Sequence, residues 1–318
     1  MSKRTEIDEF YDLADQRMRE ERYDEAISLY RKLAEMNPED DSIAMSLACA
    51  YRDSGGISDA VLCLERLLEK ELQRKTFTGF AFDELVKIYR DEGNYESLVA
   101  ICESAVAVQP DDLSLLFTLG SSYLKARRAD KAVDIFMMLT EREPDAPSFF
   151  CNLGNAHLAA GDFDKAEDAY SNAASIEPLD APKFHGELGV AFFQAKQYER
   201  AEIYLKRSLE CLSDQPLIHC ALGDVFIKQE KLDDANLSYE TATDLDPTSR
   251  GAYYNRLGNM LANERNHMMA INAFEKAVSA DPQNPFYYIG LVKSCEVEGF
   301  HDKARETYNN AKSKGVFS

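Results

Sequence analysis

Small and apolar residues recur along this chain with a fixed period. A Leu-Gly pair appears about every 34 residues, at Leu119-Gly120, Leu153-Gly154, Leu188-Gly189, Leu222-Gly223 and Leu257-Gly258. An alanine followed four positions later by a large apolar residue comes after each of them, at Ala132/Phe136, Ala166/Tyr170, Ala201/Leu205, Ala235/Tyr239 and Ala270/Phe274. Around these positions apolar residues lie three and four apart, which is typical of amphipathic helices. The pattern predicts a series of similar helix pairs.

Prolines mark where the units end. They stand at residues 38, 110, 144, 178, 247 and 282, and successive spacings are close to one or two units. Filling in the double steps gives nine units that begin near residues 7, 41, 79, 113, 147, 182, 216, 251 and 285, with extra residues at 75–78, 181 and 250. A single helix pair cannot bury its apolar face, so the neighbouring units must cover it. The sequence therefore predicts a stack of units.

The pattern resembles the tetratricopeptide repeat (TPR) family, whose 34-residue unit reads W-x2-L-G-x2-Y, then A-x3-F, then P. The unit from residue 147 carries Phe150, Leu153, Gly154, His157, Gly161, Ala166, Tyr170, Ala173 and Pro178 at the matching positions. The first leucine is present in all nine units, at residues 13, 47, 85, 119, 153, 188, 222, 257 and 291. The resemblance covers about residue 7 to the end. It implies an all-α solenoid, a right-handed superhelix of nine antiparallel helix pairs whose first helices line an inner groove.

One junction departs from the repeat. The second unit has Leu72 where proline is usual, followed by the extra residues 75–78. We expect its second helix to run to about residue 74 and the angle to the third repeat to change. The expected domains are an N-terminal two-repeat arm, residues 1–74, and a seven-repeat body, residues 75–318.

Composition and charge narrow the function. The chain is 45% apolar and 29% charged, has no apolar stretch near 18 residues, and begins Met-Ser-Lys-Arg without an apolar leader. These features predict a cytoplasmic protein with no signal peptide and no membrane span. The net charge is −20, which disfavours nucleic acid as a partner. Much of the acid lies in the turns between repeats, where it either forms a solvated rim or attracts a basic partner.

The chemistry-bearing residues all have a place in the repeat. The seven cysteines are odd in number and show no C-x-x-C spacing, which indicates a reducing compartment and no zinc site. Cys151 and Cys220 are expected to line the groove. The five histidines occupy framework positions, no Ser-His-Asp or Cys-His set emerges, and there is no glycine-rich phosphate loop. We therefore expect no enzyme activity, no cofactor and no metal.

The inner groove is then the expected functional surface. The resemblance places the second, fifth, ninth, twelfth and thirteenth residues of each unit on it. The expected contact residues are Arg90, Phe117, Ser121, Leu124, Cys151, Asn152, Asn155, Leu158, Val190, Phe193, Asp224, Ile227, Asn255 and Asn259. Apolar side chains can form pockets, and asparagine can both donate to and accept from an extended backbone.

The resulting hypothesis is a non-catalytic protein–protein interaction adaptor. Repeats four to seven would bind an extended segment or an amphipathic helix of a protein partner, with Asn155 as the anchor. Changing Asn155 to alanine is expected to weaken binding with little change in melting temperature. The alternatives are a homo-oligomeric scaffold or a regulatory subunit of a larger complex. A chaperone-type carboxylate clamp is not expected, because Cys151 and Asn255 stand where the clamp has lysine.

Overall fold

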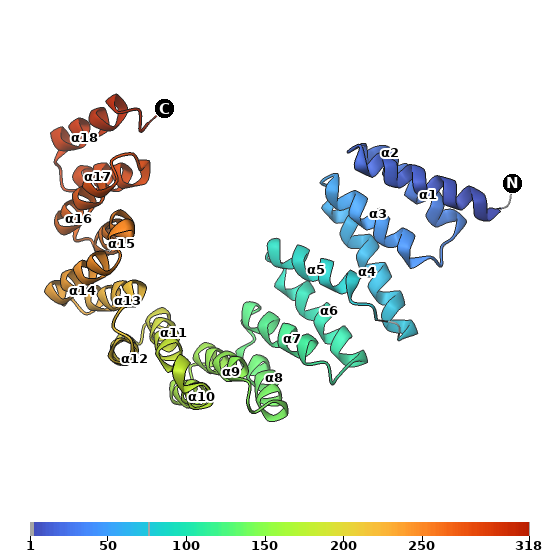
Figure 1. Cartoon of the computed structure of the whole chain (residues 1–318), viewed down its shortest axis with the longest axis horizontal. Helices are drawn as coiled ribbons and strands as arrows, with labels where there is room; N and C mark the ends of the chain where they lie inside the picture. Colours follow the sequence, from blue (N-terminus) through green and yellow to red (C-terminus); the bar gives the residue numbers. More distant parts are fainter. Residues whose placement is uncertain (1–2, 76, 318) are drawn as a thin grey trace. The chain divides into compact units, whose positions relative to one another are not determined.

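The structure is a computed structural model that describes residues 3–75 and 77–317. In these residues the chain forms helices joined by short turns and contains no strand (Figure 1). The all-α fold predicted from the repeat is therefore confirmed.

The chain divides into two compact units, residues 1–142 and 143–318. The first unit contains four helix pairs. Their helices are α1 (Lys3–Arg19), α2 (Tyr23–Met36), α3 (Asp41–Asp53), α4 (Ile57–Arg74), α5 (Phe80–Asp91), α6 (Tyr95–Val108), α7 (Leu113–Lys125) and α8 (Ala129–Arg142).

The second unit contains five pairs. They are α9 (Pro147–Ala160), α10 (Phe163–Ile176), α11 (Ala181–Gln194), α12 (Tyr198–Cys211), α13 (Pro216–Lys228), α14 (Leu232–Leu245), α15 (Arg250–Asn263), α16 (His267–Ala280), α17 (Pro285–Val297) and α18 (His301–Ser313). Short 3₁₀ turns, η1 (Pro178–Asp180) and η2 (Pro247–Ser249), precede α11 and α15.

The predicted register agrees with the helix starts. The first helices of repeats two to nine begin at residues 41, 80, 113, 147, 181, 216, 250 and 285, within one residue of the expected positions. Only α1 differs, because it begins at Lys3 rather than near residue 7. The repeat pattern fixes the residues that pack between helices, and it does not limit how far a helix extends before them.

The second helix of repeat two ends where the missing proline predicted. Helix α4 runs to Arg74, and Lys75 adopts a left-handed conformation with φ of 56°. The carboxylate of Glu71, which is buried, accepts hydrogen bonds from the hydroxyl and the backbone N–H of Thr78. This junction lies inside the first compact unit, so the two units do not coincide with the expected arm and body. A division after residue 74 stays a prediction.

The turn inside each pair has the same backbone conformation. The fifteenth residue of every repeat has a positive φ: Glu21, Gly55, Gly93, Arg127, Gly161, Lys196, Glu230, Arg265 and Gly299. The next N–H then returns to a carbonyl near the end of the first helix, as Asp162 does to His157 at 2.8 Å. A left-handed residue in this place ends the helix and reverses the chain.

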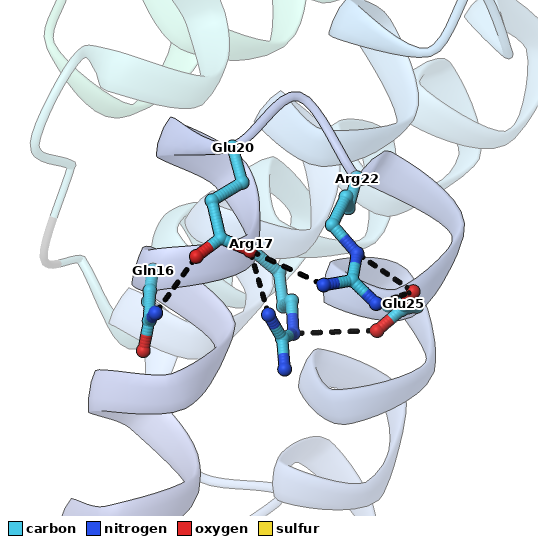
Figure 2. Close-up of polar contacts among 5 residues, drawn as sticks. All are labelled: Gln16, Arg17, Glu20, Arg22 and Glu25. Carbon is cyan, nitrogen blue, oxygen red and sulfur yellow. Dashed lines mark hydrogen bonds and ion pairs between the residues drawn. The ribbon is translucent and has the colours of Figure 1, made fainter.

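Charged side chains join the first helix pair at its turn, as Figure 2 shows. Arg17 lies 2.6 Å from Glu20 and 3.2 Å from Glu25, and Arg22 pairs with Glu25 at 2.5 Å. Gln16 donates to Glu20 at 2.7 Å. All of these side chains except the half-buried Arg17 are exposed, so water and salt screen the ion pairs.

Glycine permits the closest approach between paired helices. A Cβ added at Gly154 would lie 2.5 Å from Cδ2 of Tyr170, so a larger residue at this position would prevent α9 and α10 from approaching as closely as they do.

At the other end of the second unit, Phe317 stacks on Tyr308 and packs edge-on against Tyr288, with ring centroids 5.5 and 6.2 Å apart. The tail therefore covers apolar surface of the last repeat.

Candidate functional site

The expected groove residues all lie on first helices. In the first unit Arg90 is on α5, and Phe117, Ser121 and Leu124 are on α7. The other ten lie in the second unit: Cys151, Asn152, Asn155 and Leu158 on α9, Val190 and Phe193 on α11, Asp224 and Ile227 on α13, and Asn255 and Asn259 on α15.

Three of these residues are buried. Cys151 is 8% exposed, and Asp224 and Ile227 are each 3% exposed. Cys220, also expected in the groove, is completely buried. The first helices of neighbouring repeats cover these positions, so the four side chains serve packing and offer no contact surface as they stand.

The remaining residues differ in access. Arg90 and Asn259 are exposed, and the others are half-buried. Phe117 packs edge-on against Phe136, with ring centroids 6.0 Å apart. Asn152 donates to the backbone carbonyl of Ser148 at 2.8 Å, so its amide is partly engaged within α9.

Asn155 has a structural partner that the sequence analysis missed. Its side-chain oxygen accepts a hydrogen bond from the hydroxyl of Tyr170 at 2.9 Å. The same 15-residue pairing recurs between Tyr30 and Asp15, at 2.5 Å, and between Tyr239 and Asp224. A tyrosine on a second helix thus has an Asp or Asn partner on the preceding first helix. This spacing is visible in the sequence and could have identified the pairing.

Asp224 belongs to the most enclosed of these pairings. Arg256 of the next repeat donates to its other carboxylate oxygen from Nε at 3.0 Å and from Nη2 at 2.5 Å. Burial raises the pKa of Asp224, while Arg256 and Tyr239 act in the opposite direction. The carboxylate, tyrosine and guanidinium therefore join α13, α14 and α15 through one buried network.

A hollow of about 440 Å³ opens beside Asn155 in the second unit. Its volume is within the range of about 300–1,000 Å³ typical of ligand pockets. The residues that matter most for its chemistry come from α9, α11 and α13, and are Asn155, Lys183, Glu187, Val190, Gln194 and Ile218. Two of them, Asn155 and Val190, were expected from the sequence. We call this hollow the Asn155 pocket.

The Asn155 pocket combines an apolar wall with polar groups that remain available. Val190 and Ile218 are half-buried and pack against the core of the unit. Glu187 and Gln194 make no hydrogen bond or ion pair within residues 3–75 and 77–317, and the amide N–H₂ of Asn155 likewise has no acceptor there. Such a surface can bind an extended segment through both apolar contact and hydrogen bonds.

A larger hollow, of about 710 Å³, lies in the first unit between α2, α4 and the turn before α4. It contains none of the expected contact residues. Arg31 on its wall donates to the hydroxyl of Tyr51 at 2.6 Å, so this polar group is already engaged. The smaller Asn155 pocket is the better candidate, because Glu187, Gln194 and the amide N–H₂ of Asn155 are unengaged among the described residues and the first helices form most of its lining.

His157 and Cys151 are buried and have packing environments. Burial lowers the pKa of His157, which keeps its imidazole neutral at pH 7. Burial, together with the nearby charge of Glu187, raises the pKa of the Cys151 thiol to about 12. Across the part of the chain that the structure describes, no three His, Cys, Asp or Glu residues gather as a metal site would require. None of the described helices is both long enough and apolar enough to cross a membrane.

Comparison with known proteins identifies the repeat. The tetratricopeptide repeat pattern matches residues 17–75, 114–146, 151–216 and 220–285, well over half of the chain. The chloroplast tetratricopeptide repeat domain-containing protein PYG7 of Arabidopsis thaliana is 31% identical over 102 residues, 31% of this chain and 34% of that protein. The BBSome complex member BBS4 of Bos taurus is 26% identical over 289 residues, 91% of this chain and 54% of that protein. The chain thus spans about a third and about half of the length of these two relatives.

A solved structure agrees on the fold. The C-terminal part of a TPR repeat-containing protein from Cytophaga hutchinsonii has a TM-score of 0.50 and 15% identity, covering 71% of this chain and 93% of that one. A MamA crystal structure has a TM-score of 0.39 and 18% identity, covering 52% of this chain and 95% of that one. The repeat matches and the nine helix pairs lead to one conclusion: this chain belongs to the tetratricopeptide repeat family.

Proposed function

We propose that this chain is a non-catalytic adaptor of the cytoplasm that binds an extended segment of a protein partner in the Asn155 pocket. Membership of the TPR family supports a role in protein–protein interaction and a generally non-catalytic fold. The observation that carries the finer proposal is the pocket itself, where an apolar wall meets unengaged polar side chains.

The pocket suits an extended segment for geometric reasons. It lies across three successive first helices, α9, α11 and α13, so a ligand there runs from one repeat to the next. An extended backbone leaves its N–H and C=O groups free, and the amides of Asn155 and Gln194 can bind such groups. Val190 and Ile218 then provide apolar contact for one side chain of the segment.

The experiment is a selection of peptides on the full chain. A random library of 12-residue peptides displayed on phage is enriched on the protein, and synthetic copies are measured by fluorescence anisotropy. The blocking variant is Gln194→Trp, which places an indole in the pocket from an exposed position. The matched control is Asn172→Trp, an exposed substitution on α10 that does not line the pocket.

We expect enriched peptides to lose at least about tenfold in affinity on the blocking variant, which corresponds to about 1.4 kcal/mol. They should bind the control variant as they bind the original chain. Peptides that bind both variants equally, or a selection that enriches no peptide, would overturn the proposed function.

Self-association is a second candidate, favoured by the last repeat. Phe286 is 72% exposed there, and Ile289 and Val297 on the same helix, α17, are also exposed. The residues at the equivalent positions of repeat seven are Cys220 and Lys228. Cys220 is completely buried there, whereas Ile289 is exposed on α17. A second copy packed against α17 would bury this apolar surface. Multi-angle light scattering on the chain and on a Phe286→Ser/Ile289→Ser variant distinguishes a dimer from a monomer.

A further inference from the structure

Two places in the second unit share the same arrangement of side chains around a tyrosine, but one has an arginine where the other has a glutamate. In repeats seven and eight, Asp224 binds Tyr239 within its own repeat and Arg256 in the next. Tyr239 follows Asp224 by 15 residues, and Arg256 follows it by 32. The guanidinium of Arg256 thereby fills the space between successive first helices with a cation.

Repeats five and six reproduce this arrangement without its cation. Asn155 binds Tyr170 at the same 15-residue separation. The residue 32 positions after Asn155 is Glu187, which therefore takes the place of Arg256. Here the space between the first helices is the Asn155 pocket of about 440 Å³, and both Asn155 and Glu187 line it.

Glu187 is a free acceptor at this pocket. Its carboxylate makes no hydrogen bond or ion pair with any residue in the described ranges 3–75 and 77–317. Glu187 also contributes, after burial and the Cys151 thiol, to the raised pKa of Tyr170. The opposing charge on the wall is Lys183, one turn earlier on α11, whose Nζ lies 5.8 Å from the ring centroid of Phe184.

We propose that the Asn155 pocket binds a basic side chain, arginine or lysine, of the partner segment. This inference rests on the proposed function and names the chemistry of the ligand. The cationic head forms an ion pair with Glu187, as Arg256 does with Asp224 in repeats seven and eight. The aliphatic stem lies against Val190 and Ile218, the usual way in which long basic side chains bury their methylenes. The net charge of −20 favours the approach of such a partner.

The test compares Glu187→Gln, which keeps the shape of the side chain and removes its charge, with the original chain. The probes are the synthetic peptides whose binding is lost on Gln194→Trp. Each is made with its basic residues replaced one at a time by glutamine. The four combinations of protein and peptide form a double-mutant cycle, which isolates the interaction between the two groups.

We expect one basic residue to recur in the peptides. Replacing it, or changing Glu187 to glutamine, should each weaken binding at least tenfold, and the two changes together should cost no more than either alone. Lys183→Ala should leave this coupling intact and strengthen binding about twofold. The thermal midpoint of the Glu187→Gln variant should equal that of the original chain, because Glu187 has no partner within the described residues.

Two results would overturn the inference in distinguishable ways. Peptides that require the pocket but contain no recurrent basic residue, or that bind Glu187→Gln with unchanged affinity, contradict the basic ligand and leave the proposed function standing. If no peptide depends on the pocket, the proposed function fails and this inference fails with it.

Discussion

The side-chain oxygen of Asn155 accepts a hydrogen bond within the fold, while its N–H₂ group is a free donor among the described residues. A mutation must therefore distinguish the effect on stability from the effect on binding. The hydroxyl of the buried Tyr170 donates to the side-chain oxygen of Asn155. Asn155 also lines the pocket, and its N–H₂ group has no acceptor among the described residues. The sequence suggested a pure contact residue, because a position in the repeat shows which helix face a side chain occupies. It does not show which partner across the helix pair that side chain binds.

Replacing Asn155 by alanine therefore has a cost that the sequence analysis did not anticipate. The hydroxyl of Tyr170 loses its acceptor, and an unsatisfied buried polar group costs about 1–3 kcal/mol. Urea unfolding followed by circular dichroism measures this loss. Asn155→Asp is the informative comparison, because aspartate accepts from tyrosine at the equivalent positions 15 and 224. An alanine variant as stable as the original chain would contradict the bond.

The Asp variant separates binding from stability. It retains the acceptor for Tyr170 and removes the N–H₂ donor of a residue that lines the pocket. We expect the free energy of unfolding to stay within about 0.5 kcal/mol of the original. Because Asn155 is proposed to donate to the partner backbone, affinity for the peptides whose basic residue is replaced by glutamine should fall by several-fold.

The lowered pKa of Glu202 predicts how the stability of the second unit changes in acid. It accepts from Lys206 at 2.6 Å and from Lys231 at 2.9 Å. Burial acts to raise its pKa, but these hydrogen bonds outweigh burial and lower the pKa of Glu202 to about 2. A carboxylate with a lowered pKa stabilises the folded state above its unfolded pKa of about 4.3, and this contribution is lost as the pH falls toward 2.

We expect Glu202→Gln to be less stable than the original chain at pH 7, with a difference that shrinks between about pH 4.3 and 2. Urea unfolding at a series of pH values measures the difference in the free energy of unfolding. A difference that stays constant down to pH 2 would show that the lysine contacts do not lower the pKa of Glu202.

At the scale of helices, the repeat pattern predicted where nearly every first helix begins. First helices begin within one residue of the expected positions in eight of nine repeats, because prolines and the Leu-Gly pair fix the register. The pattern was less informative about burial. Asp224 and Ile227 are covered by packing between neighbouring repeats, and this depends on the particular side chains that meet there. The Asn155 pocket also depends on particular side chains. Glu187 leaves open a space between neighbouring first helices that Arg256 fills at the equivalent position in repeats seven and eight.

Gly154 tests the close approach of α9 and α10. A methyl group at this position would lie 2.5 Å from the ring of Tyr170, so either the ring or a helix must move. We expect Gly154→Ala to lower the free energy of unfolding by about 1–3 kcal/mol, despite the better helix propensity of alanine. Ala159→Ser, on the exposed side of the same helix, is the control and should change it by less than about 0.5 kcal/mol. Equal stability of Gly154→Ala and the original chain would show that this contact is not tight.

At the scale of the whole molecule, the chain consists of two compact units and carries a net charge of −20. The sequence predicted the number of helix pairs correctly. Its division into an arm and a body at residue 74 stays a prediction, and the two compact units meet elsewhere, after residue 142. The inserted residues 75–78 suggested a boundary. In the structure Glu71 and Thr78 connect the two sides of that insertion, and the helices around it belong to one unit.

The net charge predicts how a basic partner associates. Long-range attraction raises the association rate and is screened by salt, with a Debye length of about 10 Å at 0.1 M and about 3 Å at 1 M. We expect the association rate of a pocket-dependent basic peptide to fall about tenfold between about 0.05 and 0.5 M NaCl, with a smaller change in the dissociation rate. Stopped-flow fluorescence measures both rates. An association rate independent of salt would contradict steering by the overall charge.

The most direct test of the central claim is photo-crosslinking with a selected peptide. The peptide carries a benzophenone side chain next to its basic residue, and mass spectrometry locates the crosslinked residues on the full chain. The account predicts crosslinks to α9, α11 and the start of α13, around Gln194 and Ile218, and their loss in the presence of unlabelled peptide. Crosslinks confined to the second helices, such as α10, α12 and α14, would contradict it.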